Sequence, residues 1–589
     1  MKKIVLSTVT ATTLMLLTTG CGDSTTKTET TVKTTQSRSV ATTKRVSKED
    51  REKALRARID SYAKYGFDIN QTADDSYILT IKEPSKSVDL LLSIFSLNLT
   101  VQDEEKKELQ EVLDGTQFDV KIDWDRYVAN QKDSVEVNII GRADINSTDP
   151  LIKLLKDKKV GAYLTYNDKD ELKKIDIKDI DELLTQDNTK ATIKLTNAFV
   201  DIEQTPTKTS DKRVYTLNAG KLNIQITDES NITSTMGYKD ITCKIDKSNA
   251  YLGLQECKAP TLYLKADNKT TSPMSVSLTN SSYSYDIKAK DKKVSEEIAI
   301  TIDGIDINSE ISLKNLKLLA DIKNIDEDTI KSYMSLMENP SSNYKDDMKK
   351  LISLAGKMYS NGMSLHYDGS IETIDATLDR LKVNLQDYHI TGDGKADSQL
   401  NYHEKSNIKK LSILDSKNST NNFVLDNFSF GYGIKNLYNF IPESMSIISE
   451  VSTEENSTKI EETLQKDGTS LANKTLNYGV GFEINPISLD NLKITNYTLS
   501  DTDFNLDITL KKNNLNINDL IQNPMIALTL LKANGKLVVP IKDLQTLAQQ
   551  PELAMLGMLM MFAKIEDKNA IFVLKFENGK LTVNDKPIM

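Results

Sequence analysis

The sequence predicts a mainly β protein with α insertions (α+β), whose body is an elongated antiparallel sheet built from hairpins. Three observations predict this fold class. Apolar and polar residues alternate in short runs through most of the chain. Asparagine, aspartate and glycine separate many of these runs, as tight turns require. Helical periodicity is confined to short stretches near both ends and at the middle.

The chain begins with the features of a secretory signal peptide. Two lysines precede a short apolar, threonine-rich run that ends at Gly20 and Cys21. This ending resembles the lipobox of bacterial lipoproteins, although Thr18 stands where that motif has leucine. The resemblance implies removal of residues 1–20 and acylation of Cys21, with palmitate among the expected chains. An unlipidated signal peptide and a membrane helix are the alternatives, but the apolar run is shorter than the roughly 20 residues that a membrane span needs.

Composition and charge limit the partners that we expect. The formal net charge is −10, and acidic and basic residues are interleaved without a basic patch, so no nucleic-acid partner is expected. Residues 21–48 are rich in threonine, serine and lysine and nearly free of apolar residues, which predicts a disordered tether. We expect two β-rich halves after it, at residues 49–325 and 326–589, with apolar helices in the second.

Helical periodicity and helix-terminal residues predict the helices. Ser47 with Asp50 three residues later is typical of a helix N-terminus. In the middle of the chain, Asn339 and Pro340 break one helical stretch into a pair, which marks the boundary between the halves. The stretches with helical periodicity are 47–65, 88–113, 326–360, 517–531 and 544–562.

Period-two alternation predicts the strands. In the run FDVKIDW, for example, Phe118, Ile122 and Trp124 fall on one side of a strand, and charged residues fall on the other. The last strands flank Asn578 and Gly579, a strong hairpin signal. Strands with one apolar and one polar face are typical of antiparallel sheets that contact water on one side.

Three sets of side chains are candidates for covalent modification. Besides Cys21, Cys243 and Cys257 flank a predicted hairpin symmetrically and could form a disulfide in an oxidising compartment, with two free thiols as the alternative. Three asparagines lie in Asp/Glu-x-Asn-x-Ser/Thr frames that resemble the bacterial N-glycosylation sequon; they are Asn146, Asn231 and Asn456.

No catalytic or cofactor motif is visible. The histidines are His366, His389 and His403, and none has a metal-ligand partner at the usual local spacing. The chain lacks the GxSxG, P-loop and dinucleotide fingerprints. We therefore expect no metal, no cofactor and no enzymatic activity.

Three segments resemble the YdgA-like bacterial envelope proteins, a family of unknown function. They are KDKKVGAYLTYND at 156–168, GVGFEINPISL at 479–489 and the closing GKLTVNDKPIM at 579–589. The resemblance implies a membrane-anchored, periplasmic, β-rich body and no catalytic residues. That family begins with an uncleaved membrane helix, whereas this chain begins with a lipobox.

These observations favour a non-enzymatic lipoprotein of the bacterial envelope, anchored by acyl chains in a membrane and facing the periplasm. It would act as a scaffold, a partner-binding surface or a carrier of lipid-like molecules. A carrier requires an apolar strand face that is left open. One alternative is an envelope hydrolase, which requires a histidine beside serine, aspartate or glutamate in a cleft. The other alternative is a surface adhesin or antigen.

Overall fold

The computed structural model begins to describe the chain at residue 47. From there it describes all residues except 89–106, 108–109, 111–112, 133, 141–158, 168–171, 187–188, 207–210, 230–231, 248–251, 268–273, 339–343, 361, 419–421, 453, 455, 496, 551–556, 558–559 and 589. The expected signal peptide and nearly all of the expected tether therefore lie outside the described residues, as does most of the helix predicted at 88–113.

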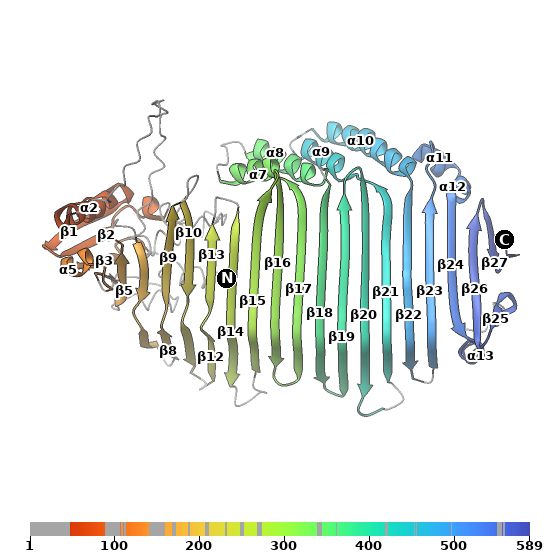
Figure 1. Cartoon of the computed structure of the whole chain (residues 1–589), viewed down its shortest axis with the longest axis horizontal. Helices are drawn as coiled ribbons and strands as arrows, with labels where there is room; N and C mark the ends of the chain where they lie inside the picture. Colours follow the sequence, from red (N-terminus) through yellow and green to blue (C-terminus); the bar gives the residue numbers. More distant parts are fainter. Residues whose placement is uncertain are drawn as a thin grey trace, which may run out of the picture. The chain divides into compact units, whose positions relative to one another are not determined.

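The described chain is mostly β, with short helices, and its strands pair antiparallel in a large open sheet (Figure 1), as the alternation predicted. It divides into two compact units. The first consists of Met1–Asp246 with Ala266–Thr270, and the second of Lys247–Lys265 with Thr271–Met589. The helix pair at which the sequence suggested a boundary lies inside the second unit.

The first unit contains the larger hydrophobic core. Its strands are β1 (Phe67–Ala73), β2 (Ser76–Ile81), β3 (Gln117–Ile122), β4 (Val135–Ile140), β5 (Lys159–Tyr166), β6 (Leu172–Ile177), β7 (Ile180–Gln186), β8 (Thr189–Thr196), β9 (Phe199–Pro206), β10 (Asp211–Asn218), β11 (Lys221–Thr227), β12 (Thr233–Lys239) and β13 (Thr242–Lys247). Strands β1 to β6 pair in chain order, β6 pairs next with β9, and β7, β8, β11 and β12 form a second run.

Helices cover the core at the start of the first unit. Helix α2 (Lys48–Ser61) begins where predicted, since the Ser47 side chain accepts a hydrogen bond from the backbone of Asp50. A 3-10 turn, η1 (Tyr62–Tyr65), follows it. Leu55, Tyr127 and Leu79 are among the buried residues that join α2, α5 (Trp124–Val128) and the strands in one cluster. Trp124 was expected at the end of a strand, but Asp123 caps α5 and Trp124 is its first residue.

The second unit is an antiparallel meander. Its strands are β14 (Gly253–Asp267), β15 (Met274–Lys290), β16 (Lys293–Ile307), β17 (Ile311–Asp326), β18 (Met363–Leu378), β19 (Leu381–Ala396), β20 (Gln399–Asp415), β21 (Phe423–Tyr438), β22 (Val480–Ile494), β23 (Tyr497–Leu510), β24 (Leu531–Pro540), β25 (Lys564–Glu566), β26 (Asn569–Glu577), β27 (Lys580–Val583) and β28 (Lys586–Pro587). From β15 to β24 each strand pairs with the next in the sequence, and β24 then pairs with β26. The hairpin predicted at Asn578 and Gly579 is confirmed between β26 and β27.

Cross-strand register places many of the apolar residues of this meander in shared rows, with glycine and serine at some of the positions between them. Leu318 on β17, for example, lies in one cross-strand row with Ile390 on β19 and Phe430 on β21. Because directly opposed residues share a face, these rows form one side of the sheet. We call this side of β15–β24 and β26 the apolar face, and the opposite side the polar face.

A row of left-handed residues crosses the same meander. Every second strand from β15 to β23 contains one asparagine or aspartate with φ between 38° and 52°; these are Asn280, Asn315, Asp387, Asn427 and Asp501. We call this set the αL row. Its side chains bond polar partners on neighbouring strands, as Asn280 does with Asp303 at 3.0 Å and Asn427 with Asp490 at 2.6 Å. Such residues interrupt the alternation and bend a strand, so the row interrupts several strands at the same level.

Helices line one end of the strands in the second unit (Figure 1). They are α7 (Glu327–Glu338), α8 (Tyr344–Met358), α9 (Ile441–Val451), α10 (Ser457–Tyr478), α11 (Ile517–Gln522) and α12 (Met525–Leu530). The predicted pair at 326–360 is confirmed as α7 and α8, whereas α9 and α10 were not predicted. The helix expected at 517–531 is divided at Asn523 and Pro524. The last helix was expected at 544–562; the described residues there include the second half of α13 (Ile541–Ala548), helical residue 557 and a 3-10 turn, η3 (Met560–Phe562), and 551–556 and 558–559 lie outside the described residues.

Candidate functional site

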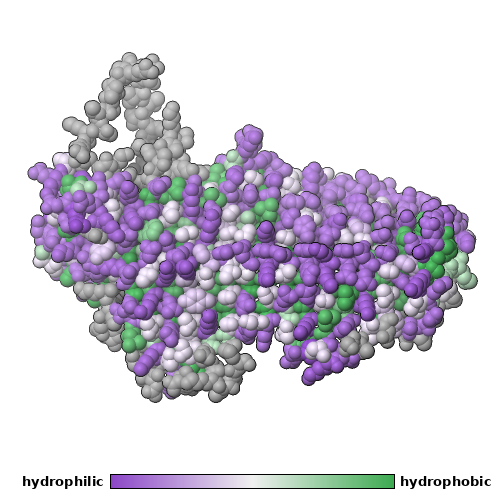
Figure 2. Space-filling view, turned by 60° about the horizontal axis from the view of Figure 1, so that its bottom comes forward, coloured by the Kyte–Doolittle hydropathy of each residue, from purple (hydrophilic) through white to green (hydrophobic). Residues whose placement is uncertain are grey.

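The apolar face lacks a second layer over much of its described part. Strands β18 to β22 pack mainly on their neighbours in the sheet, with α10 against β21, while α7 contacts β16 and β17 at one end. Leu318 and Phe482 are each 38% exposed, whereas Leu79 in the first unit is 1% exposed. Figure 2 shows hydrophobic patches that reach the surface between hydrophilic rows. The described strands therefore leave apolar surface of the kind that binds apolar molecules.

One end of this face forms an apolar groove beneath α10. The groove has a volume of about 510 Å³ and is lined by Phe440, Gly468, Leu471, Ala472, Thr475, Leu476, Val480 and Leu510. Val480 and Leu510 are opposed residues of β22 and β23, so the groove is continuous with the apolar face. Helix α10 has 22 residues, none of them buried, which leaves its apolar side in contact with the groove rather than with a packed core.

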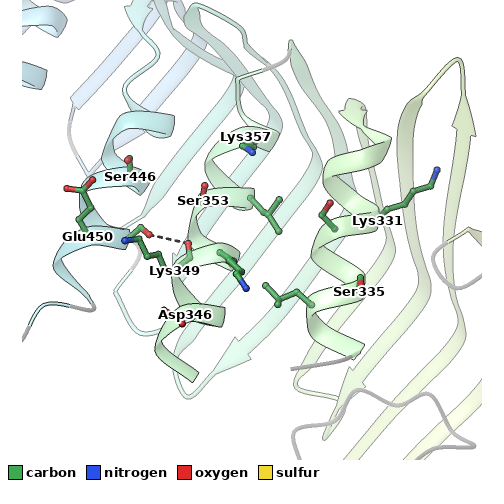
Figure 3. A pocket seen from close by; sticks show the side chains of 13 residues that line it. Lys331, Ser335, Asp346, Lys349, Ser353, Lys357, Ser446 and Glu450 are labelled. Atoms are coloured by element: carbon green, nitrogen blue, oxygen red, sulfur yellow. Dashed lines mark hydrogen bonds between the residues drawn. The ribbon is translucent and has the colours of Figure 1, made fainter. Parts of the chain in front are cut away.

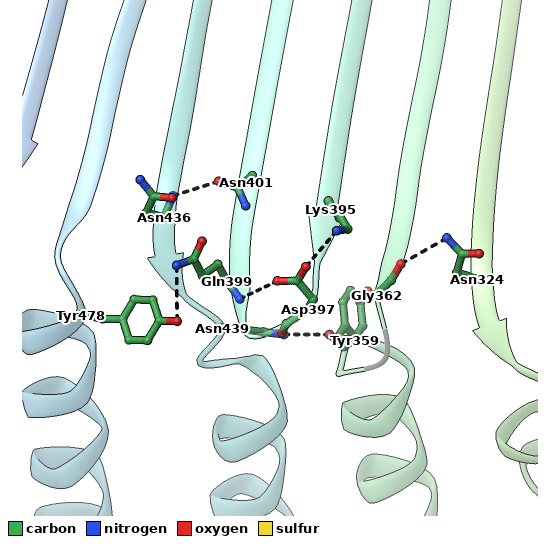
Figure 4. Close-up of polar contacts among 10 residues, drawn as sticks. All are labelled: Asn324, Tyr359, Gly362, Lys395, Asp397, Gln399, Asn401, Asn436, Asn439 and Tyr478. Atoms are coloured by element: carbon green, nitrogen blue, oxygen red, sulfur yellow. Dashed lines mark hydrogen bonds and ion pairs between the residues drawn. The ribbon is translucent and has the colours of Figure 1, made fainter.

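Polar contacts fix the helices to the ends of the strands (Figure 4). The Asn439 side chain donates hydrogen bonds to the carbonyls of Tyr359 at 2.7 Å and Asp397 at 2.6 Å. The Gln399 side chain donates to the hydroxyl of Tyr478, the last residue of α10, at 3.3 Å. These bonds join the ends of α8 and α10 and the start of α9 to the residues where β19 ends and β20 begins.

A cluster of tyrosines around Glu404 interrupts the apolar face. Glu404 on β20, Tyr367 on β18 and Tyr432 on β21 lie in one cross-strand row. The hydroxyls of Tyr402 (2.6 Å) and Tyr367 both donate to the same carboxylate oxygen, Oε2 of Glu404, and the two hydroxyls lie 2.6 Å apart. We call these four residues the Glu404 cluster.

A glycine makes room for the cluster, and burial keeps its hydroxyls protonated. Gly392 on β19 separates Tyr367 from Glu404 in the row, and a Cβ there would lie 2.3 Å from the Tyr367 ring. Burial and then the bond to Glu404 raise the pKa of Tyr367 to about 12. The same two causes raise the pKa of Tyr402 further. Both hydroxyls therefore remain hydrogen-bond donors at neutral pH.

A second acidic group lies on the same face. Glu296 on β16 interacts electrostatically with Tyr285 on β15, and its cross-strand row leads to Tyr402. Burial raises the pKa of Glu296, and burial followed by the charge of Glu296 raises the pKa of Tyr285 to about 12. The two polar clusters therefore occupy adjacent rows of an otherwise apolar surface.

The histidines gather on the polar face. His366 Nδ1 lies 2.7 Å from Asp393, and His389 Nε2 lies 3.2 Å from Asp368. His403 is opposite Asp393 in the register. The side chains of His366 and His389 are 42% and 43% exposed. One requirement for a hydrolase, a histidine beside a carboxylate, is met, but both pairs lie on an open strand face rather than between covering elements.

A polar recess lies between α7, α8 and α9 (Figure 3). Its volume is about 880 Å³, and lysines and serines are the main lining residues, with Asp346 and Glu450 among them. Ser449 donates a hydrogen bond to the carbonyl of Lys349 at 3.1 Å across it. The lining side chains of α7 and α8 include exposed residues of the hydrophilic sides of these helices, such as Lys331 and Lys357. The recess is therefore lined by polar groups together with leucines and the apolar stems of lysines, whereas the lining of the groove beneath α10 holds no charged residue.

The modification sites predicted from sequence have different outcomes. The disulfide between Cys243 and Cys257 is confirmed. Asn456 is exposed and caps α10 by accepting hydrogen bonds from the backbones of Thr458 and Lys459. Cys21, Asn146 and Asn231 lie outside the described residues, so the acylation and the remaining glycosylation sites stay predictions.

Within the described ranges, no helix is long and apolar enough to cross a membrane. In the same ranges, no group of three or more His, Cys, Asp or Glu side chains is arranged to hold a metal ion. Comparisons with protein-family models, curated proteins and solved structures found no match for this chain.

Proposed function

We propose that the protein is a lipid-anchored lipoprotein of the bacterial envelope that carries lipid-like molecules on its apolar face. The observation that carries this proposal is the apolar face itself, which continues through the meander and lacks a second layer over much of its described part. Surface of this kind is unfavourable in water and marks a binding site in a soluble body. A carrier requires an apolar strand face that is left open, and the exposed apolar face supports the proposal in this respect.

The energetics favour an acyl chain as the occupant. Each methylene that leaves water contributes about 0.8 kcal/mol, and the face offers rows of leucine, isoleucine and phenylalanine side chains. The groove beneath α10 provides a partly enclosed end, where Val480 and Leu510 contribute to an apolar lining. A chain lying across the rows would gain from burial on both surfaces without any change in the strands.

Anchoring by Cys21 complements this role. A lipoprotein tether would hold the apolar face near a membrane, which is the source of acyl chains. The residues that support this part are Gly20 and Cys21 in the resemblance to a lipobox and the polar stretch at 21–48. The compartment, facing the periplasm, follows from the same motif.

A binding experiment with two neighbouring substitutions tests the carrier function. Leu506 on β23 belongs to the apolar face, and the preceding Asn505 is exposed on the polar face. Leu506→Asp introduces a charge among acyl contacts, and we expect at least a tenfold loss of affinity for a fluorescent acyl probe. Asn505→Asp adds the same charge on the other side and should change the affinity less than twofold. Circular dichroism confirms that both variants fold.

Native mass spectrometry of the purified chain provides an independent measurement. We expect co-purifying lipid with the wild type and less with Leu506→Asp. Equal probe affinity for both variants, or neither lipid nor probe binding by the wild type, would contradict the carrier function. Crosslinking in cells to one protein neighbour would then support a scaffold. Cleavage by external protease on whole cells would instead support an adhesin.

A further inference from the structure

We propose that the Glu404 cluster is a headgroup site that selects amphiphiles bearing an ammonium group. This inference rests on the proposed function, because it concerns which acyl compounds the apolar face accepts. The proposal names the chemical class of the ligand's headgroup. A surface that bound only acyl chains would not need a charged cluster of this kind.

The carboxylate has bonding capacity left. Both tyrosine hydroxyls reach Oε2 of Glu404. The described residues contribute no hydrogen bond to the other oxygen, Oε1. A carboxylate accepts through both oxygens, so a further donor would complete its coordination. A ligand on the apolar face would approach from the side that the described strands leave open.

The neighbouring hydroxyls are already committed as donors. Tyr402 and Tyr367 point to Glu404, and the ring of Tyr432 lies beside that of Tyr402, with centroids 5.9 Å apart. The cluster therefore presents a negatively charged acceptor surrounded by protonated hydroxyls and apolar side chains. An ammonium group forms a charge-assisted hydrogen bond there, whereas a carboxylate ligand is repelled by Glu404. A ligand hydroxyl would bind more weakly than an ammonium group, because its hydrogen bond is not ion-paired.

The position of the cluster suits an amphiphile. Ile484 and Leu506 continue the row of Glu404 and Tyr432 on β22 and β23. A headgroup at Glu404 would thus have apolar surface beside it for the attached chain. Four inter-strand spacings of about 4.8 Å separate β20 from β24, which gives an acyl chain roughly 19 Å of surface.

The experiment compares three probes with the same sixteen-carbon chain: hexadecylamine, hexadecanol and palmitate. Each compound competes with a neutral fluorescent acyl probe for binding to the full-length protein, which has been purified and freed of lipid. We expect the amine to bind about tenfold more tightly than the alcohol, and palmitate more weakly than either. Glu404→Gln should weaken the amine about tenfold and leave the alcohol within twofold.

Glu297→Gln is the matched control. Glu297 adjoins Glu296 in sequence but is exposed on the polar face, so its substitution removes one negative charge far from the proposed ligand. Tyr402→Phe should give an intermediate loss of amine affinity, because the carboxylate remains but one hydroxyl that positions it is lost. Thermal unfolding verifies that each variant is folded.

The outcomes separate the two proposals. If the neutral probe and the alcohol bind but the amine has no advantage, the headgroup site is refuted and the carrier function stands. The headgroup site is also refuted if Glu404→Gln and Glu297→Gln lower amine binding equally, or if only Glu296→Gln lowers it. If no probe binds the wild type, the carrier function itself fails.

Discussion

The openness of the apolar face can be tested by comparing two leucines. Leu79 on β2 is 1% exposed in the core of the first unit, and Leu318 on β17 is 38% exposed on the apolar face. Replacement by alanine removes the same atoms at both positions. We expect Leu79→Ala to destabilise its unit by about 3–4 kcal/mol, because a cavity remains in a packed core.

The expected cost at Leu318 is smaller. The atoms removed are worth about 2.4 kcal/mol when fully buried, at about 0.8 kcal/mol for each carbon group. With 38% of the residue exposed, the remaining burial corresponds to about 1.5 kcal/mol. No cavity cost is added, because one side of Leu318 already lies open. We therefore expect Leu318→Ala to cost no more than about half as much as Leu79→Ala.

The unfolding of each unit can be followed by its own measurement. Trp124 is the sole tryptophan and lies in the first unit, so its fluorescence during urea unfolding measures Leu79→Ala. Native-state hydrogen exchange of peptides from β16 to β18 measures Leu318→Ala. If Leu318→Ala cost 3 kcal/mol or more, the face would be covered in solution, for example by a second chain. The reasoning about an open binding face would then be wrong.

Three further predictions concern other parts of the chain. Replacing both Cys243 and Cys257 with serine should destabilise the fold by about 3 kcal/mol, measured against the wild type in urea without reductant. The pKa of Tyr367 is raised to about 12 in the folded protein, so the contribution of its protonated hydroxyl to stability is present below pH 10 and is lost as the pH rises through 12. Urea unfolding midpoints of the wild type should therefore fall over this pH range, and those of Tyr367→Phe should fall less. Cys21→Ser should abolish acylation and release the chain from membranes, and unchanged fractionation would contradict the anchor.

The alternation of residues was enough to predict the fold class. Runs such as Phe118 to Ile122 define strands because every second side chain must enter the same environment. The disulfide could also be predicted, since Cys243 and Cys257 lie symmetrically about a turn that the sequence predicts. Helix α10 was missed because its apolar side faces an open groove, so its apolar residues are fewer and interrupted by threonine and glycine.

The Glu404 cluster was harder to predict for a different reason. Tyr402 and Glu404 are two residues apart on one strand, but Tyr367 lies 35 positions before Tyr402 and meets it only through the register of three strands. Local patterns contain no information about that register. The one local signal is Glu404 itself, which occupies a position where the alternation of its strand expects an apolar residue.

The αL row shows how the sequence maintains one apolar face on long strands. In β17 the order Leu313, Lys314, Asn315, Leu316 places two polar residues between apolar ones, which in a regular strand would move the later residues to the opposite side. The left-handed conformation of Asn315 resets the alternation, so that both leucines remain on the same side. Asp387 and Asn427 do the same in β19 and β21 at the matching level. The intervening strands have the same three-residue step without a left-handed residue, as between Ile302 and Ile305 of β16, so the row marks the level at which the spacing of apolar residues changes in neighbouring strands.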